Sequence, residues 1–479
     1  MNEKRKAGWS PRVGRLVLPV LAAFWLPLPG FVQDAGAQET GQPAAEAGNT
    51  ETNDAETGQS EDRVEDEKAG ETDPRVLARE EQARRERIES LSRRPSQLPT
   101  EGRSLTSTAV PAALSSQQGV RFGRSVISPS AFLGATYTDN ANNTETDREE
   151  DVLFGGTARL RVDSLLRRHA LGAEASVTAG SSLTGNDDDV FGWEVGADGR
   201  YDLSRQSAVG AAVSGSLAQE ADSSNQADGT DAEVNDFSSS LGYQFTGRRL
   251  DYALNVSADR ADFSGEDTAD RDFWSYGVGG RVVRLVNDRL ALFVAPQYTI
   301  DRFDEVSDDD GIDRDSAQLS AVVGADYQPR PRLTLGAALG YSETFFEDPD
   351  TDDQGEIIGS LSATYSYDPR TDVGLVVSRQ TDVTTADDAA SETVTAVGVD
   401  VIRLLSSERA VNAAATYAYS DFSGADRTDH GVTASLGYFH RLNDYLLIEL
   451  GYQFQARQSD IDNNDFYENQ VRVGMNITY

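Results

Sequence analysis

Few residues in this chain of 479 have the chemistry of a catalytic or metal site. There is no Cys, and the only His are His169, His430 and His440. Without Cys the chain has no thiol nucleophile, disulfide framework, zinc finger or iron–sulfur cluster. A hydrolase needs a base beside a nucleophile, and no Ser-centred motif accompanies His430. We therefore expect no enzyme activity, no catalytic residue and no cofactor.

Runs of carboxylates are the second feature with a chemistry of its own. Asp308–Asp310 before Gly311, and the run 348–353, resemble Ca²⁺ sites because hard carboxylate oxygens suit that ion. Neither run has the twelve-residue spacing of an EF-hand. Solvated acidic loops are the favoured interpretation, with loose divalent bridging to lipopolysaccharide as the alternative. We expect no dedicated metal site.

The overall charge excludes one large class of partners. The chain carries 80 Asp and Glu against 43 Lys and Arg, a formal net charge of −37. A nucleic-acid-binding surface needs clustered positive charge. No nucleic-acid partner is expected.

The N-terminus predicts export from the cytoplasm. Residues 1–15 carry five positive charges, 16–32 are largely apolar, and Ala35-Gly36-Ala37 follows. This is the layout of a secretory signal peptide, which we expect to be cleaved after Ala37. An N-terminal membrane anchor fits less well, because three Pro interrupt the short apolar run.

The segment 38–120 has the composition of a tether. Residues 38–73 contain almost no large apolar side chain and are predicted to be disordered. Residues 74–95 contain good helix formers, which predicts a short helix, either solvated or docking a periplasmic export component. Residues 96–120 are rich in Ser, Thr and Pro and are predicted to form a linker.

The remainder, 121–479, repeats with an interval of 36 to 43 residues between short turn clusters. Eight short turns and nine longer acidic loops join 18 segments. Within each segment apolar and polar residues alternate, as in strands with two different faces. In the last one, Val471, Val473 and Met475 share a face opposite Arg472 and Gly474.

Strands of this kind predict an all-β fold, a transmembrane antiparallel up-and-down β-barrel. Closure leaves no unpaired strand edge in lipid, and bacterial outer-membrane barrels have even strand numbers. A propeller would need four shorter strands per repeat, and a soluble sandwich would turn its apolar face inward. We expect 18 strands in the outer membrane of a Gram-negative bacterium, with the polar face lining the lumen rather than forming a packed core.

Aromatic residues gather at the strand ends and predict two girdles at the membrane interfaces, in contact with lipid and lipopolysaccharide. A terminal aromatic also resembles the signal that the outer-membrane assembly machinery reads, which makes Tyr479 the expected contact with that machinery. The girdle residues are Tyr201, Tyr243, Tyr365, Tyr438 and Tyr479 at the short turns, and Tyr298, Tyr341, Tyr417 and Tyr452 at the long loops.

Charge is divided between the two ends of the predicted barrel. The nine long loops hold 46 acidic residues and five Arg, a net charge of −41, whereas the eight short turns have a net charge of +5. Because long loops face the exterior in this architecture, the acid is predicted to coat the cell surface.

Charged residues on the polar face predict a channel lining whose mixed charges set selectivity. A barrel of 18 strands is wide enough for an aqueous channel, which favours a pore over a lumen closed by paired charges or a plug. The predicted pore-lining residues are Arg159, Arg161, Glu194, Asp198, Arg200, Arg281, Glu449 and Arg472.

Several motifs resemble the putative β-barrel porin-2 family of proteobacterial outer membranes. They are Gly119–Gly123, Pro129, Phe132–Asn140, His169-Ala170-Leu171 and Tyr201–Ser204. The resemblance extends over 119–479 and is most specific in its first third. It implies an outer-membrane barrel, and for some members an exit port for secreted polysaccharide, but it assigns no functional residue.

Three functions follow as alternatives. The first is a porin-like channel for solutes. The second is the outer-membrane port of an exopolysaccharide export system, which the resemblance and the long tether favour. The third is a non-conducting surface barrel whose acidic loops bind ions, lipopolysaccharide or a neighbour.

Overall fold

The computed structural model describes most of the chain from residue 110 onward. The described residues are 110, 111, 114, 119–146, 148–166, 168–184, 189–219, 233–264, 269–306, 311–349, 351–386, 389–425, 427–461 and 464–479. The predicted signal peptide, the predicted helix over 74–95 and the Asp308–Asp310 run lie outside them.

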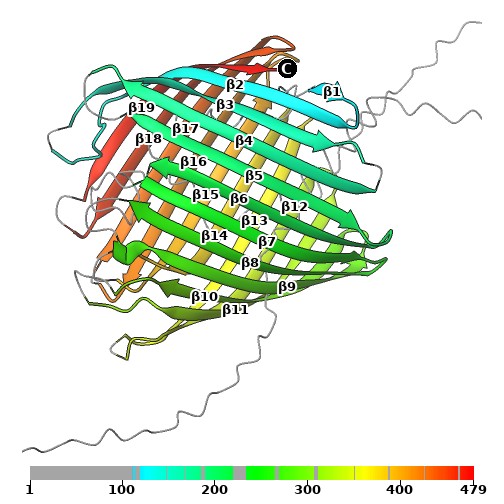
Figure 1. Ribbon diagram of the computed structural model, residues 1–479, viewed down its shortest axis with the longest axis vertical. Coiled ribbons are helices and arrows are strands. Elements are labelled where there is room, and N and C mark those ends of the chain that lie inside the picture. The colour runs from blue at the N-terminus through cyan, green and yellow to red at the C-terminus, as the bar shows by residue number, and fades with distance from the viewer. Residues whose placement is uncertain are drawn as a thin grey trace, which may run out of the picture.

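Within these residues one antiparallel sheet closes on itself as a barrel of 18 strands, as the sequence predicted (Figure 1). No helix in the described part is long and apolar enough to cross a membrane. The wall strands are β2 Ser125–Thr138, β3 Asp151–Ser164, β4 His169–Ser182, β5 Val190–Asp202, β6 Ser207–Gln219, β7 Glu233–Thr246, β8 Leu250–Ser264, β9 Phe273–Asn287, β10 Leu290–Phe303, β11 Ser316–Arg330, β12 Leu333–Phe346, β13 Gln354–Asp368, β14 Thr371–Val383, β15 Ser391–Leu404, β16 Arg409–Ser423, β17 Arg427–Asn443, β18 Leu446–Ser459 and β19 Phe466–Thr478.

Each wall strand pairs with its sequence neighbours, and β19 pairs with β2 to close the ring. Wall strands are 13 to 17 residues long. At a rise of about 3.4 Å per residue and a tilt near 45°, about 13 residues cross a hydrocarbon core of about 30 Å. Strand length therefore matches a membrane span.

The connections differ at the two ends. Short turns such as Pro369-Arg370 join strands at one end, and longer loops join them at the other (Figure 1). The long loops are shorter than predicted, because the strands extend into them. Asp421 and Asp429, for example, belong to β16 and β17 rather than to the loop between them. We call the two openings the short-turn mouth and the long-loop mouth.

An extra strand precedes the wall. The sequence predicted that the barrel starts at residue 121, but β1 Val120–Phe122 only pairs back on the start of β2. Gly119 before it has a φ of +59°, and a Cβ there would lie 2.4 Å from Val126 Cγ1, so a side chain is excluded. Its amide donates to the Tyr479 carbonyl at 3.0 Å, which ties this hairpin to the C-terminus.

Alternation gives the barrel two chemically different faces. Large apolar side chains such as Val323, Leu339 and Ile357 are strongly exposed on the outer face. The inner face is mostly polar, but contrary to the prediction that it holds no packed core, apolar side chains pack on it. Three apolar clusters are buried on it: Val283, Phe293, Ala295, Val322, Ala338 and Ile358; Leu114, Ala410, Phe439 and Leu447; and Ala386, Ala389 and Phe422.

Candidate channel and its two mouths

All eight residues predicted to line the pore lie at inner-face positions, on β3, β5, β9, β18 and β19. They differ in how far they reach the lumen. The Arg159 side chain is 47 % exposed, and Glu194 is exposed and makes no ion pair with any residue the structure describes. Arg281, Glu449 and Arg472 are buried under neighbours and contribute charge to the wall rather than open surface.

The densest charge cluster lies on β3, β4 and β5. The Arg161 guanidinium is 3.1 Å from Asp163 Oδ1, 3.3 Å from Glu174 Oε2 and 3.3 Å from Asp198 Oδ1. Arg159 Nε is 3.2 Å from the other Glu174 oxygen. Two cations and three carboxylates thus share one patch of the inner wall.

A glycine makes this cluster possible. Gly172 lies between the charged strands, and a Cβ there would be 2.6 Å from Asp198 Oδ1 and 2.9 Å from Arg161 Nη2. The close approach of these two groups therefore requires the missing side chain.

Arg281 forms a second, drier site. Its guanidinium lies 3.6 Å from the centre of the Phe293 ring and 3.4 Å from Asp326 Oδ2. The ring in turn packs into the space left by Gly324, where a Cβ would be 2.2 Å away. Cation–π contact and an ion pair together compensate the burial of the charge.

Arg200, Glu449 and Arg472 each have a hydrogen-bond partner on the inner wall. Arg200 Nε donates to Asp202 at 2.8 Å. Asn476 Nδ2 donates to Glu449 at 2.8 Å, and Arg472 Nε donates to Thr136 Oγ1 at 3.4 Å.

The long-loop mouth is narrowed by part of the wall itself. The end of the β14–β15 hairpin, 381–386 with 389–391, is here called the hairpin tip. Of these nine residues, only Asp382 and Val383 are not buried, whereas a wall strand buries alternate residues. Gln318 Nε2 on β11 donates to the Thr381 carbonyl at 2.9 Å, although β12 and β13 separate these strands in the wall. The hairpin tip therefore leans into the lumen.

Three other elements hold the hairpin tip. Arg314, between β10 and β11, is 1 % exposed and donates from Nη2 to the Ala386 carbonyl at 3.3 Å. Ala386 and Ala389 pack on Phe422 of β16, and the Ala390 amide donates to the Ser423 carbonyl at 2.9 Å.

The short-turn mouth receives a piece of the N-terminal segment. Leu114 is 2 % exposed and packs with Val110 against Phe439 and Leu447, on the inner face of β17 and β18. The Leu114 amide donates to the Pro111 carbonyl at 2.8 Å, which turns the segment. An otherwise polar lumen thus carries an apolar patch where the chain enters the barrel.

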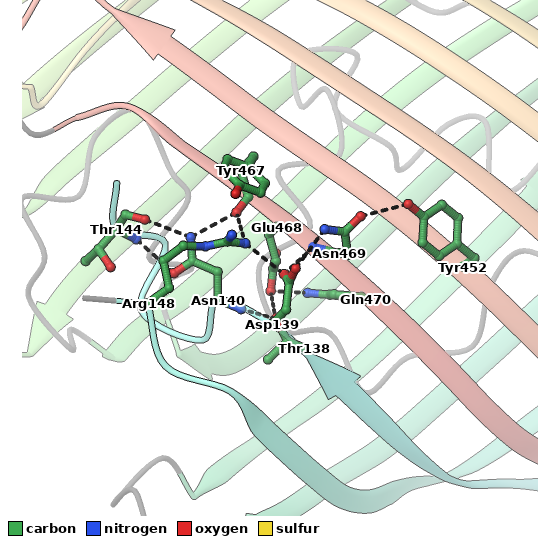
Figure 2. A network of polar contacts seen from close by, with 10 residues as sticks. All are labelled: Thr138, Asp139, Asn140, Thr144, Arg148, Tyr452, Tyr467, Glu468, Asn469 and Gln470. Carbon is green, nitrogen blue, oxygen red and sulfur yellow. Dashed lines mark hydrogen bonds and ion pairs between the residues drawn. The ribbon is translucent and has the colours of Figure 1, made fainter. Parts of the chain in front are cut away.

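A polar network closes the ring above the last β19–β2 pair, Gln470 with Thr138 (Figure 2). We call it the closure clasp: Thr138, Asp139, Asn140, Thr144, Arg148, Tyr452, Tyr467, Glu468, Asn469 and Gln470. Asn140 Nδ2 and Arg148 Nη2 donate to the Tyr467 carbonyl at 3.0 and 2.8 Å. The Asn469 amide donates to Asp139 Oδ1 at 2.7 Å. Side chains of the loop between β2 and β3 thus take the place of the β19–β2 backbone pairing, which ends at this point.

All nine predicted girdle tyrosines project from the outer face. His169 stacks on Tyr201 with ring centres 4.2 Å apart, and Tyr445 stacks on Tyr479 at 5.4 Å. At the other end, His430 Nδ1 and the Tyr417 hydroxyl are 2.7 Å apart. His430 thus pairs with an aromatic residue on the lipid-facing surface.

Two elements at the mouths were missed by sequence reasoning. The hairpin tip is richer in Ala than the other long loops, and Leu447 and Phe439 interrupt the polar face of their strands. Both signals were present, but alternation alone does not show what covers an inner apolar residue. The described residues hold no group of three His, Cys, Asp or Glu arranged to bind a metal.

Solved structures with a similar arrangement are barrels of low sequence identity. The siderophore receptor PirA from Pseudomonas aeruginosa has 9 % identity and a TM-score of 0.43, over 74 % of this chain and 80 % of that chain. The FrpB iron transporter from Neisseria meningitidis has 8 % identity and a TM-score of 0.43, over 74 % and 81 %. Neither likeness bears on the function of this chain, and no curated protein matches it.

A match to the model of a protein family identifies the family of this chain. The family described as "Putative beta-barrel porin 2" matches residues 115–479, which include every strand of the barrel. The resemblance in the first strands is thereby confirmed, and the chain belongs to this family of porin-like outer-membrane β-barrels.

Proposed function

We propose that this protein is a water-filled channel for small hydrophilic solutes across the outer membrane. The observation that carries the proposal is the contrast between the two faces. Exposed Arg159 and Glu194 face the lumen, whereas large apolar side chains cover the outside. Charged groups stay exposed at low cost only where water reaches them. Family membership supports the same function.

Small solutes are favoured over a polymer by the hairpin tip. With Ala386 held by Arg314, the tip occupies part of the long-loop mouth. A polysaccharide chain would need that opening along its whole length, so export requires the tip to move. Export is therefore the second candidate function, and a non-conducting surface barrel is the third.

The proposal includes an orientation. Long acidic loops face the exterior and short turns face the periplasm, as in other barrels of this class. A cleaved signal peptide delivers the chain, and Tyr479 addresses it to the assembly machinery. The acidic segment 38–109 then lies in the periplasm, within reach of an export component.

Planar-bilayer recording of the purified full-length protein tests the proposal. We expect stepwise conductance increases from protein that migrates faster on gels unheated than heated, which identifies the closed barrel. Folded protein by this criterion that gives no steps would contradict both channel functions and leave the surface barrel.

The export alternative has its own test in cells. A strain lacking the protein is compared with its parent for secreted and surface polysaccharide. Unchanged polysaccharide together with reduced uptake of small solutes supports the porin-like function and removes the export function. Loss of polysaccharide with unchanged solute uptake reverses that conclusion.

A further inference from the structure

We propose that the hairpin tip is a gate with two resting places: the lumen, where the structure places it, and the barrel wall beside β13. The effect on conductance rests on the channel function proposed above. The two positions of the tip do not depend on that function.

The ladder between β13 and β14 stops early at the long-loop end. Its last pair is Gly359 with Arg379, and beyond this pair no residue of β13 pairs with a residue of β14. The neighbouring ladders continue: β12 pairs with β13 up to Gln354, and β14 pairs with β15 up to Val383. Residues 354–358 of β13 are therefore paired on one side only. The open seam thus lies between β13 and β14.

An open strand edge in a membrane needs other partners. Ile357 is strongly exposed on the outer face, so this edge faces lipid, where unpaired backbone groups are costly. Arg379 supplies a substitute, because its Nε donates to the Ile357 carbonyl at 3.2 Å and its Nη2 to Glu356 at 2.7 Å. Ser391 Oγ likewise donates to Gln354 Oε1 at 2.7 Å. These side chains thus make hydrogen bonds at the open edge of β13, where the backbone of a neighbouring strand would otherwise pair.

The hairpin tip is held in the lumen by contacts with three other parts of the barrel. Arg314 and Gln318 donate hydrogen bonds to its carbonyls, and two Ala pack on Phe422. The Ala390 amide donates to the Ser423 carbonyl, and Ser391 Oγ donates to Gln354. The hydrogen bonds of Arg314, Gln318 and Gln354 with the tip would have to break for the tip to move into the wall.

The alternative position follows from the existing register. Continuing the Gly359–Arg379 ladder by two residues would set Ile357 opposite Thr381, and by four would set Gly355 opposite Val383. The Thr381 carbonyl lies against Gln318 in one position and would lie beside β13 in the other. The two positions exclude each other, which makes the element bistable.

Movement into the wall has a defined consequence. The hairpin tip would leave the long-loop mouth, and the ladder would extend over the open edge of β13. The long-loop mouth would then widen without any change at the short-turn mouth. A channel for small solutes would thereby admit larger ones.

Paired cysteines test the two positions, and the chain has no Cys of its own. Ile357→Cys with Thr381→Cys reports the wall position. Gln354→Cys with Ser391→Cys reports the lumen position, where these side chains touch. Leu361→Cys with Val377→Cys, paired in the same ladder, is the positive control. Oxidation of the folded protein in lipid vesicles is followed on non-reducing gels.

We expect all three pairs to form disulfides, the control fastest. Locking Ile357→Cys to Thr381→Cys should raise single-channel conductance, and reduction should return it to the starting value. Locking Gln354→Cys to Ser391→Cys should keep conductance low. If the control pair oxidises while the 357–381 pair stays reduced, the tip does not reach the wall. The tip is then a fixed constriction, and the proposed gate is wrong. Absence of conductance in every variant would contradict the channel function, yet the cross-linking would still report the two positions.

Discussion

At the scale of single residues, Asn140, just after the first wall strand, holds the closure clasp together. Its side chain is fully buried and makes three hydrogen bonds within the closure clasp. Nδ2 donates to the Thr144 carbonyl at 2.9 Å and to the Tyr467 carbonyl at 3.0 Å, and Oδ1 accepts from the Thr144 amide at 3.2 Å. One amide thus shapes the first loop and joins the two ends of the sheet (Figure 2).

Asn140→Ala should therefore weaken ring closure. Removing the amide leaves buried backbone groups without partners, at a cost of about 1–3 kcal/mol. The temperature at which the fast-migrating folded band disappears on gels should fall. Asn235→Ala is the matched control, since Asn235 is exposed and its side chain has no hydrogen bond to any described residue. Equal shifts in both variants would contradict a role for Asn140 in closure.

Leu114 gives a second residue-scale prediction, at the short-turn mouth. Leu114→Asp places a carboxylate among the apolar side chains of Phe439, Leu447 and Ala410, where an unpaired buried charge is strongly unfavourable. The segment should leave the mouth, and trypsin should cut after Arg121 faster in the folded protein. Leu114→Met conserves volume and should keep the wild-type rate. A cleavage rate unchanged by Leu114→Asp would mean that the segment is not held by this contact.

At the scale of elements, the alternation of apolar and polar residues predicted the wall strands but not the segments that cover parts of their inner face. The two-face pattern of residues such as Val471 and Arg472 is local, so the strands, turns and number of wall strands could be read from it. Whether an inner apolar residue is covered depends on distant segments. Phe439 is buried by Leu114, and Phe422 by the hairpin tip, and neither partner is near in sequence. For the same reason alternation groups the eight charged residues on one face but does not show the burial of Arg281 and Glu449.

The charge cluster shared by β3, β4 and β5 yields a prediction about selectivity. Arg161→Gln removes the cation that contacts Asp163, Glu174 and Asp198, whereas the Arg159–Glu174 ion pair remains. The inner wall becomes more negative, so preference for cations over anions should rise. Reversal potentials in a salt gradient measure the change. Arg200→Gln is the control, because Arg200 has a single carboxylate partner, Asp202. A shift no larger than that of the control would mean that the cluster does not face the ion path.

At the scale of the whole molecule, the net charge of −37 is a property of one end. The nine predicted loop segments, together with the strand ends that they include, sum to −41, which leaves the remainder of the chain close to neutral. The hairpin tip is an exception among these loops, since its described residues turn into the lumen. The acid therefore surrounds the long-loop mouth, through which solutes would enter in the proposed function.

A ring of negative potential at one mouth should make the channel cation-preferring in a way that salt removes. The Debye length is about 10 Å at 0.1 M salt and about 3 Å at 1 M, so the loops act across the mouth only in dilute solution. Reversal potentials measured at a fixed salt ratio should show cation preference at low concentration that fades toward 1 M. A preference that persists in high salt would instead locate selectivity at close range in the lumen, in the Arg161 cluster. Preference for anions in dilute salt would contradict the proposed arrangement of acid around the entrance, because like charges are excluded from a negative mouth.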